Sequence, residues 1–320
     1  MAAVKFGIIP ISVFIITYNQ ESTIIDAIKS IFNQSYPIDQ LVISDDYSSD
    51  RTWETVCKYM ERSKKPKHVR ELIVRRNDNN LGLLAHNNLL VSMMRNDFFL
   101  GHAGDDISHH NRIKELVSFY NRLGRPRHYL FHSQVRALDI PRRPILTPPV
   151  VHRNMKLDDA TSALSLHYGA SSNMSKTLWD MFGDITIDGT YEDLILGFRA
   201  ALTKSYFYIP SPLIYYRTRG GLSDPEMFHR EADGGSRMIY NLRMATYKQR
   251  LIDSRTIGNL AIGNILESLI ERYNHLPDDF DPISYLKCHN DVRESGMDPI
   301  DHYINFGMAE GRKYKLPTTR

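Results

Sequence analysis

The chain has 320 residues, of which 42% are hydrophobic and 24% charged, so it can bury a substantial core and lacks the composition of a disordered protein. Lysine and arginine total 40 against 37 acidic residues, and the net charge of +3 gives no reason to expect a nucleic-acid partner. The two cysteines, Cys57 and Cys288, lie far apart, which predicts reduced thiols and no disulfide framework.

No apolar run approaches the roughly 20 residues that a membrane-spanning helix needs, so at most peripheral membrane contact is expected. The apolar run after Lys5 lacks a signal-peptide cleavage pattern and is interpreted as a buried strand. These features predict a cytoplasmic protein, with peripheral attachment at the inner face of the membrane left open.

The first third of the chain alternates short apolar runs with amphipathic stretches, a pattern typical of a parallel sheet covered by helices. Strands are predicted at residues 11–17, 41–43, 72–74 and 98–100. A helix is predicted after each of the first three strands. Ser22 is the candidate N-cap of the first helix, and Asp50 is expected to cap the second.

Polar clusters follow three of these strands at the point where each strand ends. They are Asn19, Asp45-Asp46 and Asp105-Asp106. Because ligands of open α/β sheets bind beyond the carboxyl ends of the strands, we expect the three clusters to share one site.

The rest of the chain is expected to contain a helix from Ile113, a strand at 129–131, a proline-rich loop at 141–149, a largely helical stretch at 156–202 and short strands at 206–217. Residues 226–276 are predicted as a helical extension broken at Gly234-Gly235. Residues 277–320 are predicted as a small helical module, in which Phe306 is one of the apolar contacts. Docking or homo-oligomerisation is the hypothesis for that module.

Five short motifs occur in an order and spacing that closely resemble family 2 inverting glycosyltransferases of the GT-A fold. They are Ile16-Thr17-Tyr18-Asn19, Ser44 to Asp50, Asn80-Leu81-Gly82, Gly104-Asp105-Asp106 and Tyr191-Glu192-Asp193. The resemblance covers roughly residues 10–225, and the ordered set makes it specific, whereas any single motif would not. It implies one domain at 1–225 with a Rossmann-like α/β fold, a mixed, mostly parallel sheet with helices on both faces.

The resemblance implies a divalent metal site, Mn²⁺ or Mg²⁺, at the acidic pair. Asp106 would bind the cation through carboxylate oxygen, and Asp105 would contact the donor ribose or support the cation. Viewed without the other motifs, the pair could instead cap a helix that follows the strand.

The nucleotide pocket of the family is lined by residues that match Thr17, Tyr18, Asn19 and Gly82. Asp46 matches the residue that accepts a hydrogen bond from the base, commonly uracil. The local alternative is a set of tight turns, because Asp, Ser and Asn side chains readily bond neighbouring backbone amides.

Glu192 and Asp193 are expected near the start of a helix, as the catalytic pair. Side chains of adjacent helical residues diverge by about 100°, so one of the two should face the site, and the resemblance indicates Asp193 as the general base. The alternative is a carboxylate pair that favours the helix N-terminal dipole.

The chain departs from the family after the strand that ends near Tyr216. Many relatives place a histidine there, whereas this chain has arginines, and Arg217 or Arg219 could bind the diphosphate. A surface arginine is the alternative. His102, His109 and His110 flank the acidic pair, but their spacing fits no compact zinc site, so they are interpreted as polar loop residues.

The resulting hypothesis is transfer of a sugar from a nucleotide-sugar donor, with UDP-sugar favoured, to a hydroxyl of a glycan, glycolipid or glycoprotein during surface polysaccharide biosynthesis. The alternative is a non-catalytic nucleotide-sugar-binding or scaffold protein. Sugar-1-phosphate nucleotidyltransfer is disfavoured, because Thr17-Tyr18-Asn19-Gln20 stands where that chemistry needs a glycine-rich loop.

Overall fold

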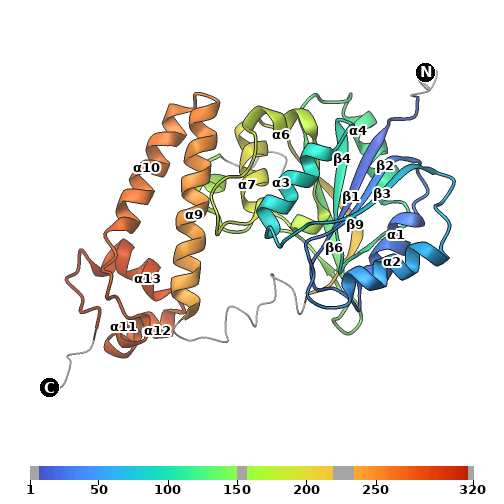
Figure 1. Cartoon of the computed structure of the whole chain (residues 1–320). Coiled ribbons are helices and arrows are strands. Elements are labelled where there is room, and N and C mark those ends of the chain that lie inside the picture. The colour runs from blue at the N-terminus through green and yellow to red at the C-terminus, as the bar shows by residue number, and fades with distance from the viewer. Residues whose placement is uncertain (1–6, 150–156, 219–233, 316–320) are drawn as a thin grey trace. The chain divides into compact units, whose positions relative to one another are not determined.

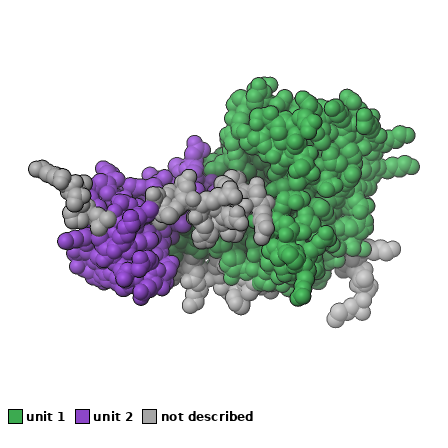
Figure 2. Space-filling view, turned by 90° about the horizontal axis from the view of Figure 1, so that it is seen from below, with its two compact units in different colours: residues 1–186, 192–218 green, residues 187–191, 219–320 purple. Residues whose placement is uncertain are grey.

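The computed structural model describes residues 7–149, 157–218 and 234–315. The chain divides into two compact units (Figure 2). The first unit comprises residues 1–186 and 192–218, and the second comprises residues 187–191 and 219–320.

The first unit is built on a mixed sheet with the strand order β3-β2-β1-β4-β8-β6-β9-β5, and β7 pairs with β6 (Figure 1). The strands are β1 (Ile11–Thr17), β2 (Ile38–Asp45), β3 (Val69–Arg76), β4 (Phe98–Ala103), β5 (Ile107–Ser108), β6 (Leu130–Ala137), β7 (Ile145–Leu146), β8 (Asn173–Ser175) and β9 (Tyr206–Tyr216). β1 is parallel to both β2 and β4, and β2 is parallel to β3. β8 runs antiparallel between β4 and β6. The expected mixed, mostly parallel sheet is confirmed.

Helices cover both faces of this sheet, as Figure 1 shows for α1 and α2 on one side and α3 and α7 on the other. The helices of the unit are α1 (Ile24–Phe32), α2 (Thr52–Arg62), α3 (Leu83–Met93), α4 (Arg112–Arg122), α5 (Leu157–Ser162), α6 (Lys176–Phe182) and α7 (Glu192–Leu202), with a 3₁₀ turn η1 (Gly169–Ser171). Because strand side chains alternate between faces, Val13 and Ile15 of β1 join the core beneath α1, α2 and α4. Phe14 points the other way and stacks on Phe99.

Local boundaries differ from the expectation where distant partners form hydrogen bonds. Ser22 is not the N-cap of α1, because Thr23 takes that position and its hydroxyl donates to the carbonyls of Gln20 and Gly104. The predicted loop 141–149 contains β7, and the predicted helical stretch contains β8. Residues 206–216 form one long strand instead of several, with an irregular register against β6 beside Ser133 and Gln134.

The second unit is helical. Its helices are α9 (Gly234–Thr256), α10 (Leu260–Asn274), α11 (Pro282–Cys288), α12 (Asn290–Ser295) and α13 (Pro299–His302), followed by a π-helical turn η2 (Tyr303–Gly307). α9 begins at Gly234, and residues 226–233 lie outside the described residues, so the predicted break at Gly234-Gly235 stays a prediction. The chain turns at Gly258, whose φ of 71° suits glycine, and α10 then packs on α9.

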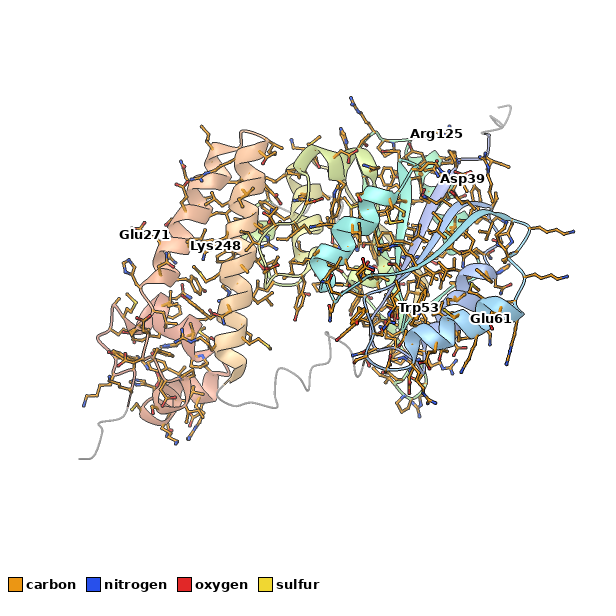
Figure 3. The ribbon with its side chains drawn as sticks, viewed as in Figure 1. Asp39, Trp53, Glu61, Arg125, Lys248 and Glu271 are labelled. Atoms are coloured by element: carbon orange, nitrogen blue, oxygen red, sulfur yellow. The ribbon has the colours of Figure 1, made fainter. Side chains whose placement is uncertain are left out.

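An aromatic cluster fills the small carboxyl-terminal part of the second unit. Tyr285 is fully buried and lies with Phe280 and Tyr303 at ring-centroid separations of 5.4 and 5.6 Å. Phe306, expected in this core, is instead 47% exposed, because η2 directs it outward. Charged side chains lie on the outside of both units, as Figure 3 shows for Glu61, Arg125, Lys248 and Glu271. Within the described ranges, no helix is both long and apolar enough to cross a membrane.

Candidate active site

Backbone hydrogen bonds bring the predicted polar clusters to one edge of the sheet. The amide of Asp46 donates to the carbonyl of Thr17 at 2.9 Å, and the amide of Gly104 donates to the carbonyl of Ile16, also at 2.9 Å. β1 therefore lies between the loops that follow β2 and β4. Thr17, Asp46 and the acidic pair leave the sheet side by side, as their positions at parallel strand ends predicted.

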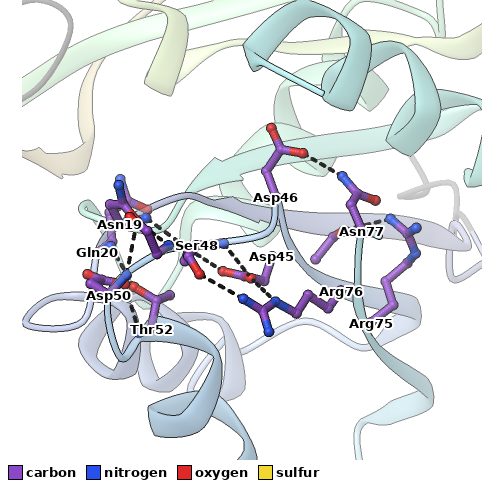
Figure 4. A network of polar contacts seen from close by, with 12 residues as sticks. Asn19, Gln20, Asp45, Asp46, Ser48, Asp50, Thr52, Arg75, Arg76 and Asn77 are labelled. Carbon is purple, nitrogen blue, oxygen red and sulfur yellow. Dashed lines mark hydrogen bonds and ion pairs between the residues drawn. The ribbon is translucent and has the colours of Figure 1, made fainter. Parts of the chain in front are cut away.

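Asn19 organises the loop that follows β2 (Figure 4). Its φ of 51° is left-handed, a conformation that Asn tolerates better than most residues. Its side-chain oxygen accepts the amides of Ser49 and Asp50, at 2.8 and 3.4 Å, and its own amide donates to the Ser48 hydroxyl. Tyr18, next to it, is 44% exposed. Asn19 therefore holds the loop, while the Tyr18 ring is open to a ligand.

Asp46 is buried, and its carboxylate shapes the turn that was expected to face the nucleotide. Oδ1 accepts from Asn77 Nδ2 and from the amide of Leu81, at 2.6 and 2.9 Å. Oδ2 accepts the amide of Gly82 at 2.9 Å, and a φ of 79° at Gly82 lets the chain turn there. A carboxylate oxygen has two acceptor positions, so Oδ2 retains one for a ligand.

Asp45 has a structural role beside this turn (Figure 4). Its side chain is 1% exposed and pairs with Arg76 at 3.1 Å, and it also accepts from the amide and hydroxyl of Ser48. The side chain of Asp50 accepts the amide of Thr52, the first residue of α2. Arg51 occupies the N-cap position, so Asp50 lies one residue before it. The acidic residues after β2 thus divide between loop structure and, at Asp46, the candidate pocket.

The acidic pair lies between β4 and β5, and a distant strand contributes to it. Antiparallel pairing of Ile107 with Tyr215 carries the end of β9 to this position. The amide of Arg217 donates to Oδ1 of Asp106 at 2.9 Å, and Arg217 Nε donates to the carbonyl of Asp105 at 3.3 Å. Arg217 is therefore half-buried beside the pair, whereas Arg219 lies outside the described residues.

The electrostatics of the pair suit a bound cation. Burial, followed by the charge of Asp105, raises the pKa of Asp106 well above its ordinary value, and burial also raises the pKa of Asp105. A hard divalent cation would relieve both effects and prefers carboxylate oxygen. Within the described part of the chain, no three His, Cys, Asp or Glu side chains are grouped to hold a metal.

Gly104, immediately before the pair, has no room for a side chain. A Cβ there would lie 2.8 Å from the hydroxyl of Thr17 and 2.9 Å from its Cβ, and would also press on Gln20. Thr17 Oγ1 donates to Gln20 Oε1 at 2.8 Å, so a displacement of one moves the other. Because Gly104 has no side chain, the end of β4 can approach Thr17 of β1 closely without displacing Thr17 or Gln20.

Gly104→Ala is expected to lower the free energy of unfolding by about 1 to 3 kcal/mol, because forcing a methyl group into a packed site displaces its neighbours. Nucleotide affinity should fall with it, since Thr17 moves. Gly7→Ala is the control, because a Cβ there would meet nothing within 4 Å. Thermal melting and calorimetric titration check this expectation, and indistinguishable behaviour of the two variants would contradict it.

Glu192 and Asp193 form the first turn of α7 and pack against Gly169. A Cβ at Gly169 would lie 3.1 Å from Glu192 Oε1 and 3.3 Å from Asp193 Cβ, so a glycine lets the segment approach closely. Burial raises the pKa of Glu192. Burial, and then the charge of Asp193, raises the pKa of Tyr206. The pair thus lies in a site that is partly shielded from water.

Sequence reasoning missed Arg112, the first residue of α4, which is fully buried. A signal was present, because Arg112 lies one helical turn before Leu116 on the apolar face that also carries Ile113. His102 was wrongly assigned to a loop. It belongs to β4, is 1% exposed, and its pKa is lowered to about 3 by burial and then by Arg112. His109 and His110 do lie outside helices and strands.

Some known proteins resemble the first part of the chain in sequence, and others resemble the chain in fold. Residues 12–126 match the family model described as glycosyl transferase family 2. EpsE of Bacillus subtilis, provisionally named a glycosyltransferase, is 32% identical over 120 residues, which are 37% of this chain and 40% of that protein. The chain thus spans well under two thirds of the length of this relative.

Two solved structures resemble the chain over most of its length. A fragment of S. aureus TarS in complex with UDP-GlcNAc matches with a TM-score of 0.56 and 16% identity, covering 97% of this chain and 95% of that chain. The mannosyltransferase PcManGT from Pyrobaculum calidifontis, in complex with GDP-Man and Mn²⁺, matches with a TM-score of 0.54 and 12% identity, covering 93% and 84%. At these identities the likeness establishes a shared fold.

Proposed function

We propose that this chain, whose residues 12–126 match the model of glycosyl transferase family 2, transfers a sugar from a nucleotide diphosphate donor to an acceptor hydroxyl, with inversion at the anomeric carbon. The observation that carries the proposal is the placement of Asp105-Asp106 beside Thr17 and Asp46 at one sheet edge. A carboxylate pair at the carboxyl ends of parallel strands suits a diphosphate held with a cation.

We propose Asp106 as the ligand of Mn²⁺ or Mg²⁺, with Asp105 supporting it. When bound, the cation would offset the charge of the departing diphosphate. Arg217, anchored to both residues through its amide and Nε, is proposed to bind the diphosphate oxygens, and Arg219 is the second candidate. The Mn²⁺ in the PcManGT complex supports this proposal.

We propose Asp193 as the general base. The acceptor hydroxyl would attack the anomeric carbon from the face opposite the diphosphate and lose its proton to the Asp193 carboxylate. The bond between that carbon and the diphosphate oxygen breaks as the new glycosidic bond forms, and its electron pair leaves with the diphosphate. Glu192, adjacent on α7, is the second candidate.

The donor is proposed to be a UDP-sugar, with Asp46 Oδ2 accepting from the base and Tyr18 and Gly82 lining the pocket. The UDP-GlcNAc complex of TarS supports this choice. We propose a glycan, glycolipid or glycoprotein acceptor in surface polysaccharide assembly. A cytoplasmic location is part of the same proposal, supported by the two free cysteines.

A thermal-shift screen of nucleotide sugars with and without Mn²⁺ tests the proposal. A ligand that binds only the folded state stabilises it, by about 2.7 kcal/mol when its concentration is roughly a hundred times its Kd. A UDP-sugar is expected to raise the melting temperature when Mn²⁺ is present and much less without it. If no nucleotide diphosphate or its sugar shifts the melting temperature in either condition, the proposal is wrong.

A non-catalytic nucleotide-sugar-binding protein would pass the same screen. Product formation separates the two functions, because a binding protein shows the Mn²⁺-dependent shift without releasing UDP. The half-buried carboxylate pair at the start of α7, packed against Gly169, favours the enzyme, since a binding protein has no need of a partly shielded base.

A further inference from the structure

Arg112 is a fully buried cation next to the candidate active site. Its Nη2 donates to the carbonyls of Ala170 and Ser172, at 2.8 and 3.3 Å, and Nη1 donates to Nδ1 of His102 at 3.5 Å. Its Nε has no hydrogen-bond partner among the described residues. Burial of an unpaired guanidinium is strongly unfavourable, so an anion nearby is required.

His102 is not that anion. A guanidinium can only donate, so Nδ1 of His102 accepts from Arg112 and the ring proton resides on Nε2, which faces the Ser30 hydroxyl at 3.4 Å. Ser30 donates to the carbonyl of Ala27 and accepts the amide of Ser108. His102 is therefore a neutral spacer that connects Arg112 to α1 and to β5.

Asp106 is the acidic side chain whose charge acts on Arg112. Its carboxylate interacts electrostatically with Arg112, and each charge partly offsets the burial of the other. Asp106 is 2% exposed and Arg112 is completely shielded, so water screens this attraction weakly. The same guanidinium thus joins His102 of β4, the strand that leads into Asp105-Asp106, to the carbonyls of Ala170 and Ser172.

Residues 169–172 in turn support the proposed base. Gly169 contacts Glu192 and Asp193 so closely that even a methyl group would touch both. Ser171 reinforces the segment, because its hydroxyl donates to the carbonyl of Tyr168 and accepts the amide of Ser133. A shift of this segment would move the carboxylates at the start of α7.

We propose that Arg112 is a positioning residue that sets the placement of Glu192 and Asp193 relative to Asp106, because one guanidinium is bonded to His102 of β4, the strand that leads into Asp105-Asp106, and to the segment 169–172. The effect of Arg112 on catalysis rests on the proposed glycosyl transfer. The effect of Arg112 on the position of residues 169–172 is independent of that proposal, because it follows from the hydrogen bonds to Ala170 and Ser172.

The test compares Arg112→Lys and Arg112→Met with Arg199→Lys. Arg199 is a matched control, because it is also fully buried and donates to two carbonyls, of Gly183 and Asp184, in the same unit. Lysine keeps the positive charge but lacks the planar guanidinium that donates to the carbonyls of Ala170 and Ser172 and to His102. Methionine removes both the charge and these hydrogen bonds.

Hydrogen–deuterium exchange of the peptide that covers residues 169–175 is expected to accelerate in both Arg112 variants and to stay unchanged in Arg199→Lys. The peptide that covers residues 190–196 should also accelerate in the Arg112 variants, and it is compared with the wild type alone, because Arg199 lies on α7 itself. The kcat for transfer should fall about 10-fold for lysine and about 100-fold for methionine, since a displacement of 1 Å can cost that much. The donor KM should stay within about threefold in the lysine variant, because the nucleotide turn is untouched.

Two results would overturn the proposal. One is unchanged exchange at 169–175 in Arg112→Lys, which also decides the matter if the methionine variant does not fold. The other is an equal acceleration of exchange at 169–175 in Arg199→Lys, which would indicate a general cost of disturbing a buried arginine. If the wild-type protein binds no nucleotide, the proposed function fails, while the exchange measurement still decides the role of Arg112.

Discussion

Asp193→Asn is expected to reduce sugar transfer by about 100- to 10,000-fold while donor binding survives, because general base catalysis typically contributes that much. The substitution keeps the size of the side chain and its contact with Gly169, and removes only the proton acceptor. Single-turnover transfer assays measure the loss, and calorimetric titration of the donor shows whether binding persists.

Glu192→Gln is the control for this prediction, since Glu192 adjoins the same glycine and is the neighbouring carboxylate of α7. A smaller loss is expected there, because adjacent helical side chains point in different directions. Unchanged transfer in Asp193→Asn would exclude Asp193 as the base, and a large loss confined to Glu192→Gln would assign that role to Glu192.

Asp106→Asn is expected to weaken Mn²⁺-dependent nucleotide binding by about 100-fold, since removing a metal carboxylate costs a few kcal/mol and each 1.4 kcal/mol is about tenfold. The amide oxygen can still accept the Arg217 amide. The melting temperature without ligand is expected to fall as well, because the buried Arg112 loses the carboxylate that partly offsets its charge. Titration with UDP and Mn²⁺ measures the binding.

Asp97→Asn is the matched control for this second prediction. Asp97 precedes the same strand, β4, at its opposite end, and its oxygen accepts the amide of Thr177 at 2.8 Å, a bond that asparagine retains. Nucleotide binding should be unaffected. Equal weakening in the two variants would show that any charge change near β4 acts through stability, and metal-independent binding by the wild type would remove Asp106 from its proposed role.

The strands of the first half could be predicted because they carry their own signal. β1 is largely apolar, with Ser12 and the terminal Thr17 as its polar residues, and β2 ends directly in the polar loop that begins with Asp46. Parallel pairing then obliges the loops after β1, β2 and β4 to emerge at one edge. The fold class and the grouping of Thr17, Asp46 and Asp105-Asp106 followed from this geometry.

Short strands were missed, because their pairing comes from distant segments. β8 has three residues and joins the sheet only because Phe98-Phe99 and Leu130-Phe131 lie on either side of it. A sequence window over Asn173–Ser175 contains no such information, so the stretch was expected to be helical. β7 exists for the same reason, through its pairing with Val135 and Arg136.

The sequence alone determined the family resemblance and the candidate carboxylates, because residue types at strand ends are local properties. Only the tertiary structure decided what each carboxylate contacts. Asp46 accepts amides 35 and 36 residues away, and Asp106 accepts the amide of Arg217, 111 residues away. The burial of Arg112 was also decided there, since the carbonyls of Ala170 and Ser172 that receive its hydrogen bonds reach it only when the sheet and its helices pack together.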